Sequence, residues 1–204
     1  MLGFLALSMQ ELVENTQDGR VARAARTRNR VVDALLDLVE EGHLRPPASE
    51  VAARAGVSLR SVFQHFDDLE TLFHVAGERH RQRLAHLEPL PELPEELDAR
   101  VAAYVAHRAR NMEAVSPMAR AAALQAPFSP GIAALQAAAR TRHRETLAAA
   151  FARELARGED PDRLLHALEA AAGWSTWEAL RAGMGLAREE AARVLERMLL
   201  SLLR

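Results

Sequence analysis

The chain has 204 residues, 26 basic and 28 acidic residues, and a formal net charge of −2. This length fits one domain or two small ones with a hydrophobic core. All the basic residues are Arg, and the balanced charge excludes a protein that coats nucleic acid over its whole surface, so any such contact must be local. Without cysteine there can be no disulfide, no thiolate zinc site and no cysteine nucleophile. That composition fits a reducing cytosol, and we expect a cytoplasmic protein.

The fold class follows from the same composition. Ala and Leu are the commonest residues, at 41 and 30, whereas aromatic residues make up only 4%. This mixture favours helices and argues against a β-sandwich or barrel. The sequence therefore predicts an all-α protein of about nine helices.

Residues 1–19 form the predicted N-terminal tail. The apolar run 1–9 has neither a preceding positive flank nor a following cleavage site of small residues, so it is a poor signal peptide. The apolar stretches are also shorter than a membrane-spanning helix requires. We expect this tail to be disordered or to begin a short helix.

Residues 20–66 predict a three-helix domain. Apolar residues recur at helical spacing over 27–41, and short helices follow at 49–55 and 59–65. Gly42 ends the first helix, Gly56 can adopt the left-handed conformation of a helix stop, and Ser58 can cap the next helix. Two short helices joined by a tight turn, with longer helices on either side, indicate a helix-turn-helix. The fourth helix begins at Asp67 or Asp68 and makes 67–88 a linking helix.

Positive charge is concentrated around this motif. Residues 19–66 contain eight Arg against five acidic residues, so this segment carries +3 while the whole chain carries −2. We expect an arm ahead of the first helix to lie along phosphates or enter the minor groove. The Arg residues assigned to that arm are Arg20, Arg23, Arg26 and Arg28.

The run from Val51 to Leu72, VAARAGVSLRSVFQHFDDLETL, resembles the DNA-binding signature of TetR-type bacterial transcriptional regulators. The resemblance covers about residues 27–75, and the rest of the chain only by length and helical layout. It implies a DNA-binding surface that starts at the turn, where the helix presents side chains to base edges. The residues implied are Ser58, Leu59, Arg60, Ser61, Phe63, Gln64 and His65.

Two positions depart from the family pattern. The family often has Tyr where this chain has Phe63 and Lys where it has Leu69, so a hydroxyl and a cation for phosphate contacts are missing. Backbone N–H groups at the start of the fourth helix are one possible replacement. Arg60 is another, through a guanine or a phosphate.

Residues 89–204 predict a second helical domain, which the resemblance makes a ligand-binding and dimerisation domain. Helices are indicated over 95–115, 117–125, 130–157, 161–184 and 188–203. The final helix is apolar on more than one narrow stripe, which fits either an internal core helix or a dimer interface. The resemblance favours a four-helix dimer interface. Its predicted residues are Leu168, Trp177, Leu180, Leu195, Met198, Leu199 and Leu202.

A ligand pocket in this domain would be mostly apolar, with a few polar groups to orient its ligand. The alternative for each candidate residue is core packing or an ordinary surface position. The candidates are His74 on the linking helix and, in this domain, Tyr104, His107, Met112, Phe128, Trp174 and Trp177.

The sequence contains no known catalytic motif. It contains no HExxH pair, no GxSxG elbow and no glycine-rich phosphate loop, and its His spacing supports no metal site. We therefore expect a protein that is not an enzyme and that binds no metal or cofactor. The predicted function is a ligand-responsive transcriptional repressor that binds a palindromic operator as a homodimer. A small, mostly apolar effector releases it by shifting the fourth helix. The alternative is a helical ligand carrier or interaction module whose degenerate helix-turn-helix no longer binds DNA.

Overall fold

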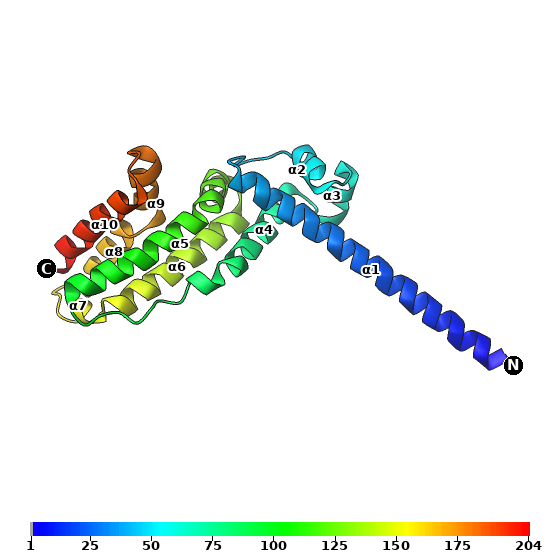
Figure 1. The fold of residues 1–204 in the computed structure, drawn as a ribbon, viewed down its shortest axis with the longest axis horizontal. Helices are drawn as coiled ribbons and strands as arrows, with labels where there is room; N and C mark the ends of the chain where they lie inside the picture. Colours follow the sequence, from blue (N-terminus) through cyan, green and yellow to red (C-terminus); the bar gives the residue numbers. More distant parts are fainter. Residues whose placement is uncertain (1) are drawn as a thin grey trace. The chain divides into compact units, whose positions relative to one another are not determined.

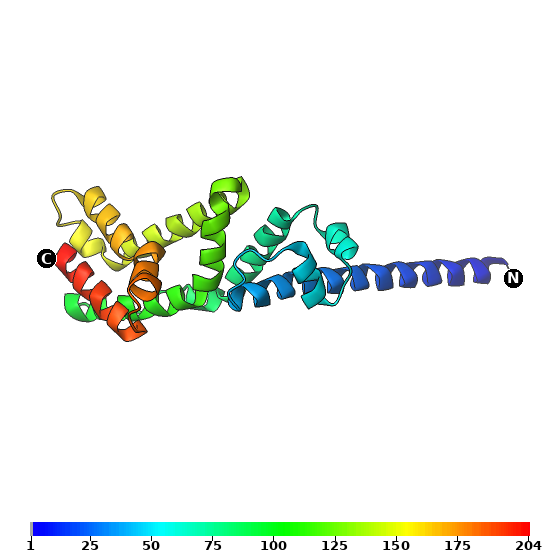
Figure 2. The same cartoon turned by 90° about the horizontal axis from the view of Figure 1, so that it is seen from above.

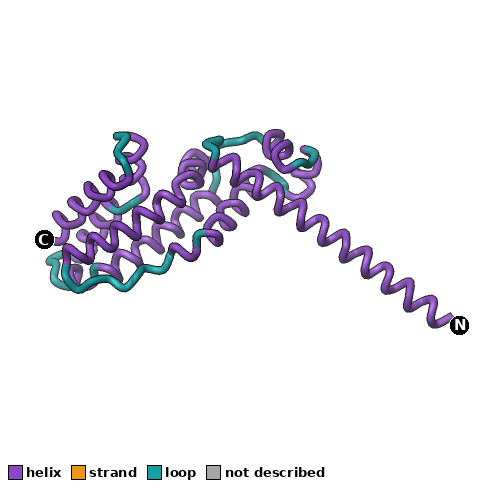
Figure 3. Tube along the Cα trace, in the orientation of Figure 1, coloured by secondary structure: helices purple, strands orange, loops and turns teal. Residues whose placement is uncertain are grey.

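The computed structural model describes residues 2–204, with side chains from residue 20 onward. Every regular element in this part of the chain is helical, and Figure 3 shows the helices joined by loops, with a long one before α5. The all-α prediction is confirmed. Among the described residues, no helix has the length and apolar character needed to cross a membrane. The chain divides into two compact units, Met1–Glu78 and Arg79–Arg204, and each is described separately below.

The first unit is built on a long helix, α1 (Leu2–Glu40), against which α2 (Ala48–Ala55) and α3 (Leu59–His65) pack (Figure 1). Helix α4 (Leu69–Arg83) begins in this unit, and its last turn belongs to the second one. The predicted order of a long helix, two short helices and a further helix is therefore confirmed. The side chains that hold these helices together are fully buried, and they include Val31, Leu35, Val51, Val62 and Leu72.

Helix α1 corrects two expectations about the N-terminal part of the chain. The predicted tail is helical from Leu2, although Met1 and the side chains up to residue 19 lie outside the described residues. The predicted Arg arm is wrong in conformation, because residues 20–30 lie within the same helix. The physical reason is that this stretch is rich in Ala and Arg, both strong helix formers, and no proline occurs before Pro46.

The second unit contains the remaining helices. Short 3₁₀ turns η1 (Ala85–Leu87) and η2 (Ala126–Phe128) precede and follow α5 (Leu97–Gln125). Then come α6 (Pro130–Ala150), α7 (Ala152–Leu155), α8 (Pro161–Ala171), α9 (Trp174–Glu178), the π-helical segment η3 (Ala179–Gly183) and α10 (Arg188–Leu203). Helices α5 and α6 lie side by side, and α10 packs on α5 and α8 (Figure 1).

The starts of α6 and α8 follow the sequence signals. Each has proline as its first residue, where a missing N–H is harmless, and a polar cap immediately before it. The Ser129 hydroxyl accepts the Ile132 N–H at 3.1 Å, and the Asp160 carboxylate accepts the Arg163 N–H at 3.0 Å. These caps satisfy backbone donors that the first turn of a helix leaves unpaired.

Three predicted helix boundaries are wrong. The helix expected over 130–157 divides at Phe151 into α6 and α7. Residues 95–115 and 117–125 form one helix, α5, which continues through Pro117 and changes direction in its C-terminal half (Figure 2). Pro117 lacks the N–H of the helical ladder, and the Ser116 hydroxyl donates to the Met112 carbonyl at 2.6 Å beside it. Conversely, the helix expected over 161–184 breaks between α8 and α9 at Gly173, where a Cβ would lie only 3.0 Å from the Glu169 carbonyl oxygen.

One hydrophobic core fills the second unit. It draws side chains from every α-helix from α5 to α10 and from η3, together with Phe151 and Ala172. The Tyr104 ring meets the Phe151 ring edge-on, with centroids 5.2 Å apart. The largest fully buried members are Tyr104, Met112, Leu147, Phe151, Leu168, Trp177, Leu195 and Leu199.

Candidate DNA interface and ligand-binding residues

The turn between α2 and α3 is defined by Gly56 and Ser58. Gly56 ends α2 in the left-handed conformation, with φ of +64°, and no atom lies within 4 Å of where its Cβ would be. Backbone conformation, rather than space, therefore favours glycine here. The Ser58 hydroxyl accepts the Ser61 N–H at 3.1 Å and caps α3. The turn thus sets the direction of α3 relative to α2.

Helix α3 has one buried and one exposed face. Val62 anchors it in the core, and Phe66 follows immediately and is also buried. On one flank of the buried face, Leu59 is 45% exposed and Phe63 is 48% exposed. They lie four residues apart and so share a face. Such side chains could contact thymine methyl groups in a major groove.

Polar side chains complete the exposed surface of α3. Arg60 and Gln64 are exposed, while Ser61 and His65 are half-buried. Arg60 makes no hydrogen bond or ion pair with any residue in the described part of the chain. Guanidinium and carboxamide groups can each make paired hydrogen bonds to a base edge. The structure therefore places the predicted residues of α3 together on one small helix, with Arg60 available for a partner.

Loss of the α3 cap should weaken the first unit. Replacing Ser58 with alanine removes the hydroxyl that accepts the Ser61 N–H and leaves this N–H only its bond to the Ser58 carbonyl, at 2.9 Å. We expect the unfolding free energy to fall by about 1 kcal/mol. Urea unfolding followed by circular dichroism measures this change. Ser49→Ala is the matched control, because Ser49 is an exposed residue of α2 that caps no helix. Equal stability of the two variants would contradict the capping role.

The arginines of α1 form a row rather than an arm. Arg20, Arg23, Arg26 and Arg30 are exposed and spaced three, three and four residues apart, which places them along one helix face. Arg28 is different: it is half-buried, and its guanidinium lies 4.9 Å from the centroid of the Phe66 ring. That cation–π contact gives Arg28 a structural role where the first and third helices meet.

The start of α4 carries a carboxylate beside Leu69, where the family's cation is missing. The Asp68 carboxylate accepts the Thr71 N–H at 2.7 Å, and this hydrogen bond holds the pKa of Asp68 below its ordinary value. A carboxylate therefore occupies the helix start, and its charge would repel a phosphate. Phosphate binding by the backbone N–H groups here stays a prediction, and the Thr71 N–H is already bonded to Asp68.

Four predicted ligand residues, Tyr104, His107, Met112 and Trp177, are buried in the second unit, though not around one opening. The Tyr104 hydroxyl and Nε2 of His143 are joined by a hydrogen bond of 3.1 Å. Met112 is fully buried in the core, and His107 is hydrogen-bonded to Asn111 at 3.1 Å. These contacts are those of packed core residues, which is the alternative that the sequence left open.

The other predicted ligand residues are placed differently. Phe128 is 81% exposed on η2, so it cannot line an enclosed pocket in this conformation, and the assignment is corrected. His74 is an exposed residue of the first unit. Trp174 is half-buried, and its indole N–H donates to the Ser116 hydroxyl at 3.1 Å.

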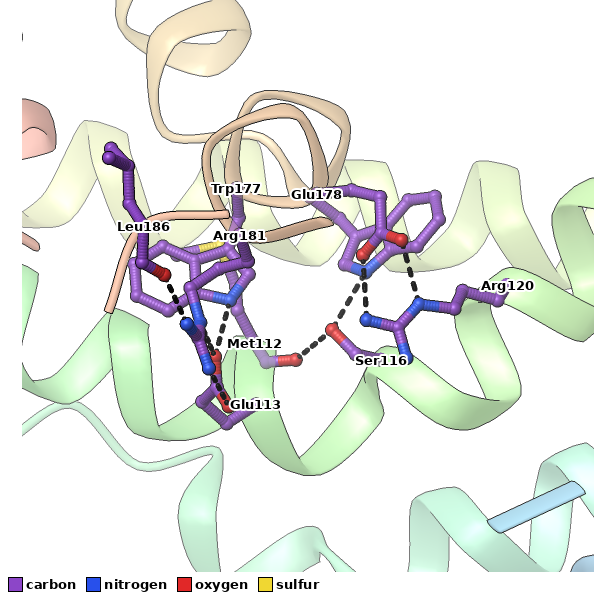
Figure 4. A network of polar contacts seen from close by, with 9 residues as sticks. Met112, Glu113, Ser116, Arg120, Trp177, Glu178, Arg181 and Leu186 are labelled. Carbon is purple, nitrogen blue, oxygen red and sulfur yellow. Dashed lines mark hydrogen bonds and ion pairs between the residues drawn. The ribbon is translucent and has the colours of Figure 1, made fainter. Parts of the chain in front are cut away.

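A polar network joins α5 to α9 and η3 (Figure 4). The Glu113 carboxylate accepts the Trp177 indole N–H at 3.0 Å and the Arg181 Nε–H at 2.7 Å. The guanidinium of Arg181 holds the pKa of Glu113 below its ordinary value. Arg120 donates two hydrogen bonds to Glu178, at 2.7 and 3.1 Å. Each charge in the network has a partner of opposite sign.

This network borders a cleft of about 280 Å³, lined by residues of α5 and η3. The sequence offered no signal for it, because Glu113 and Arg181 are 68 positions apart. Because its acids and arginines are paired with each other, this network has a structural role, and we call it the clamp. It fixes α9 and the π-helical segment on α5.

A second polar group missed by the sequence analysis is Arg108. It is half-buried on α5, one turn after Tyr104, and its Nε–H donates to the Ala172 carbonyl at 3.0 Å. Burial lowers the pKa of Arg108, and the neighbouring Tyr104 raises it by a smaller amount. The spacing of four from Tyr104 could have shown that the two side chains share a face. Nothing in the sequence pattern pointed to His143.

The predicted dimer residues fall into two groups. Leu168, Trp177, Leu180, Leu195 and Leu199 are buried in the chain's own core, so they pack within the unit, and their assignment to an interface is corrected. They face inward because α10 packs on α5 and α8, and because Trp177 of α9 and Leu180 of η3 join the same core. Met198 is half-buried and Leu202 is exposed, so these two remain accessible.

An apolar groove lies beside Met198. It has a volume of about 470 Å³ between α9, η3 and α10. Its lining is almost entirely apolar, with Met184 the most exposed of the large residues. The groove is lined by Ser175, Thr176, Ala179, Leu180, Met184, Leu186, Val194 and Met198.

Comparison by sequence finds no matching family model and no matching curated protein. Comparison by structure finds a transcriptional regulator from Rhodococcus, with a TM-score of 0.67 at 24% identity over 86% of this chain and 95% of that one. A protein from Mesorhizobium loti assigned to the TetR family aligns with a TM-score of 0.63 at 19% identity, over 89% and 96% of the two chains. A TetR-family regulator from Streptomyces coelicolor aligns with a TM-score of 0.64 at 21% identity, over 86% and 78%. The chain therefore has the fold of TetR-family transcriptional regulators.

Proposed function

We propose that this protein is a TetR-type transcriptional regulator that reads DNA with α3. The observation that carries the proposal is the exposed face of α3, where Arg60 and Gln64 stand beside two exposed apolar side chains on a helix fixed by the Gly56 turn. These groups suit the major groove, where guanine, adenine and thymine each offer a matching hydrogen-bond or methyl contact. The fold shared with the regulators above also supports the proposal.

The regulator acts as a homodimer. The groove beside Met198 and the exposed Leu202 together form an apolar surface on the last helices. This surface is larger than the single exposed apolar residues that a monomer normally carries. A two-fold dimer would set two copies of α3 about 34 Å apart, so that they enter successive major grooves of a palindromic operator. Sedimentation of Met198→Glu should then give a monomer.

Regulation proceeds through the second unit. A small effector binds there and lowers operator affinity, which makes the protein a cytoplasmic repressor rather than an enzyme. Helix α4 is the coupling element in this proposal, because its residues belong to both units. The effector can shift the equilibrium only by the difference in its affinity for the two states.

Binding to the DNA upstream of the protein's own gene tests the proposal. In a gel-shift assay we expect the full chain to bind a discrete site there, because local regulators often act on neighbouring genes. Specific binding should survive an excess of unrelated duplex, as specific affinities exceed non-specific ones by about 10³-fold or more. Binding that the unrelated duplex abolishes would refute the proposal.

The Arg row on α1 should contribute through phosphates. Replacing Arg20, Arg23 and Arg26 with alanine is expected to flatten the dependence of binding on salt, by about 0.9 in the logarithmic slope for each phosphate that is no longer neutralised. Fluorescence anisotropy across a range of salt concentrations measures the slope. The triple variant Arg153→Ala, Arg157→Ala, Arg163→Ala removes the same charge from the second unit and should leave the slope nearly unchanged. If both triple variants lower the slope equally, the α1 row has no special role.

The alternative is a helical carrier or interaction module that no longer binds DNA. Asp68 favours it, since a carboxylate caps α4 where a phosphate contact is expected, and Phe63 lacks the family's hydroxyl. Under this alternative the protein still dimerises and still binds a small ligand, but it shows no preference among duplexes. The gel-shift assay separates the two.

A further inference from the structure

The second unit encloses a cluster of polar groups that the clamp of Figure 4 does not include. Tyr104 and Arg108 lie one turn apart on α5, His143 lies on α6, and Ala172 ends α8. The Tyr104 hydroxyl and the His143 ring are 3.1 Å apart, and the Arg108 guanidinium reaches the Ala172 carbonyl at 3.0 Å. The apolar core of the same unit, which includes Leu147, Phe151 and Leu168, adjoins this meeting point of three helices.

Arg108 is the only cation of this cluster at neutral pH. Burial lowers the pKa of His143 to about 3 and also lowers the pKa of His107, so both rings are neutral. Burial raises the pKa of Tyr104 to about 12, so its hydroxyl keeps its proton. A guanidinium remains protonated in proteins, even when its pKa is lowered by burial.

This cation has no acidic partner in the described part of the chain. Its one hydrogen bond uses Nε, which leaves the two Nη nitrogens without a protein acceptor. Neither Nη nitrogen is fully buried, so both are exposed to accessible space. One turn further along α5, Oδ1 of Asn111 is a buried acceptor without a partner.

The other shielded arginines of α5, α6 and η3 are all paired with acids. Arg100 is bonded to Glu154, Arg120 to Glu178, Arg144 to Glu169 and Arg181 to Glu113. A partly buried charge without a counter-ion is unfavourable unless something else compensates it. Arg108 is the exception in this set, and its Nη pair has the geometry that binds two carboxylate oxygens.

We propose that the small molecule bound by the second unit carries a carboxylate, and that this group pairs with the Nη nitrogens of Arg108. Nε stays on the Ala172 carbonyl and holds the fork in place, and the apolar core of the unit adjoins the bound group. This inference rests on the proposed ligand-binding role of the second unit and specifies the chemistry of its effector.

Calorimetry on the full chain without DNA tests the assignment. The probes are octanoate, phenylacetate and 2-naphthoate, each compared with its primary amide, which has the same body but no charge. We expect at least one acid to bind with a dissociation constant below about 1 mM and at least tenfold more tightly than its amide. Equal binding of acids and amides, or no binding of any acid at that concentration, overturns the proposal.

Variants of Arg108 assign the binding group. Arg108→Gln should weaken the bound acid at least tenfold and leave the amide unaffected, whereas Arg108→Lys should retain part of the preference for the acid. Arg157→Gln removes an exposed arginine of the same unit and should bind as the unmodified chain does. Circular dichroism verifies that each variant is folded. A folded Arg108→Gln that keeps the full preference for the acid also overturns the proposal.

The operator-binding assay tests the proposed function independently of the acid-binding result. If the acid binds through Arg108 but does not release DNA, the site stands and the regulatory role of its ligand fails. If the protein binds its operator and no acid binds, the inference about Arg108 fails while the proposed function stands.

Discussion

Replacing Arg60 with alanine should weaken operator binding roughly 30-fold to more than 10⁴-fold. A paired contact from Arg to a base is worth about 1–3 kcal/mol, and a two-fold dimer loses it twice, which makes about 2–6 kcal/mol. The side chain is exposed on α3 and makes no hydrogen bond or ion pair within the described residues, so its removal should leave the fold intact. Fluorescence anisotropy with the operator duplex measures the change.

The pattern of the loss reveals which DNA group Arg60 contacts. If it reads a base, the variant also tolerates a changed base pair at one operator position. If it contacts phosphate, all sequences weaken about equally and the salt slope falls by about 1 for each copy. Arg157→Ala, with an exposed arginine in the second unit, is the matched control. Operator affinity of Arg60→Ala equal to that control would remove Arg60 from the interface.

A second large effect is expected when the pH is lowered. Burial lowers the pKa of His143 from 6.5 to about 3. As the pH falls below 6.5, the unfolded chain takes up a proton at this position and the folded chain does not, so folding stability decreases. The loss is at most about 1.4 kcal/mol per pH unit and roughly 4 kcal/mol over the whole window down to pH 3. Above pH 6.5 the contribution is fully present.

His143→Gln should remove this dependence. At neutral pH the variant is expected to be less stable, because it loses the hydrogen bond to Tyr104. Below pH 6.5, however, its stability should fall less steeply than that of the unmodified chain. The other titrating groups are common to both proteins and cancel in the difference. Urea unfolding at several pH values measures it, with the exposed His166→Gln as control. Parallel curves for all three proteins would refute the assignment.

The first unit was largely predictable because its signals are local. Gly56 marks a left-handed stop, Ser58 a cap, and the spacing of Val31, Leu35 and Leu38 an inward face. Each of these depends on residues within one or two turns of each other. The Arg arm failed because basic residues before a motif do not reveal whether the backbone is extended, whereas the absence of proline and the abundance of Ala did indicate a helix.

The ligand and interface residues were less predictable for a physical reason. An apolar stripe on α10 shows that the helix buries one face, but not whether the neighbour is its own chain or another. Leu195 and Leu199 pack internally, while Met198, between them in sequence, borders the groove. The partners of Arg108 and His143 lie on other helices and far along the chain. Only the packing of α5, α6 and α8 brings them together.

Selection from a pool of random duplexes tests the central claim most directly. The full chain is incubated with the pool at about physiological salt, and bound duplexes are amplified and sequenced over several rounds. If α3 reads DNA in a two-fold dimer, the enriched duplexes will share two inverted half-sites with centres about 10 base pairs apart, and Arg60→Ala will lose or relax one position in each half-site. Failure of the folded protein to enrich any sequence over the starting pool would contradict the claim that it is a DNA-reading regulator.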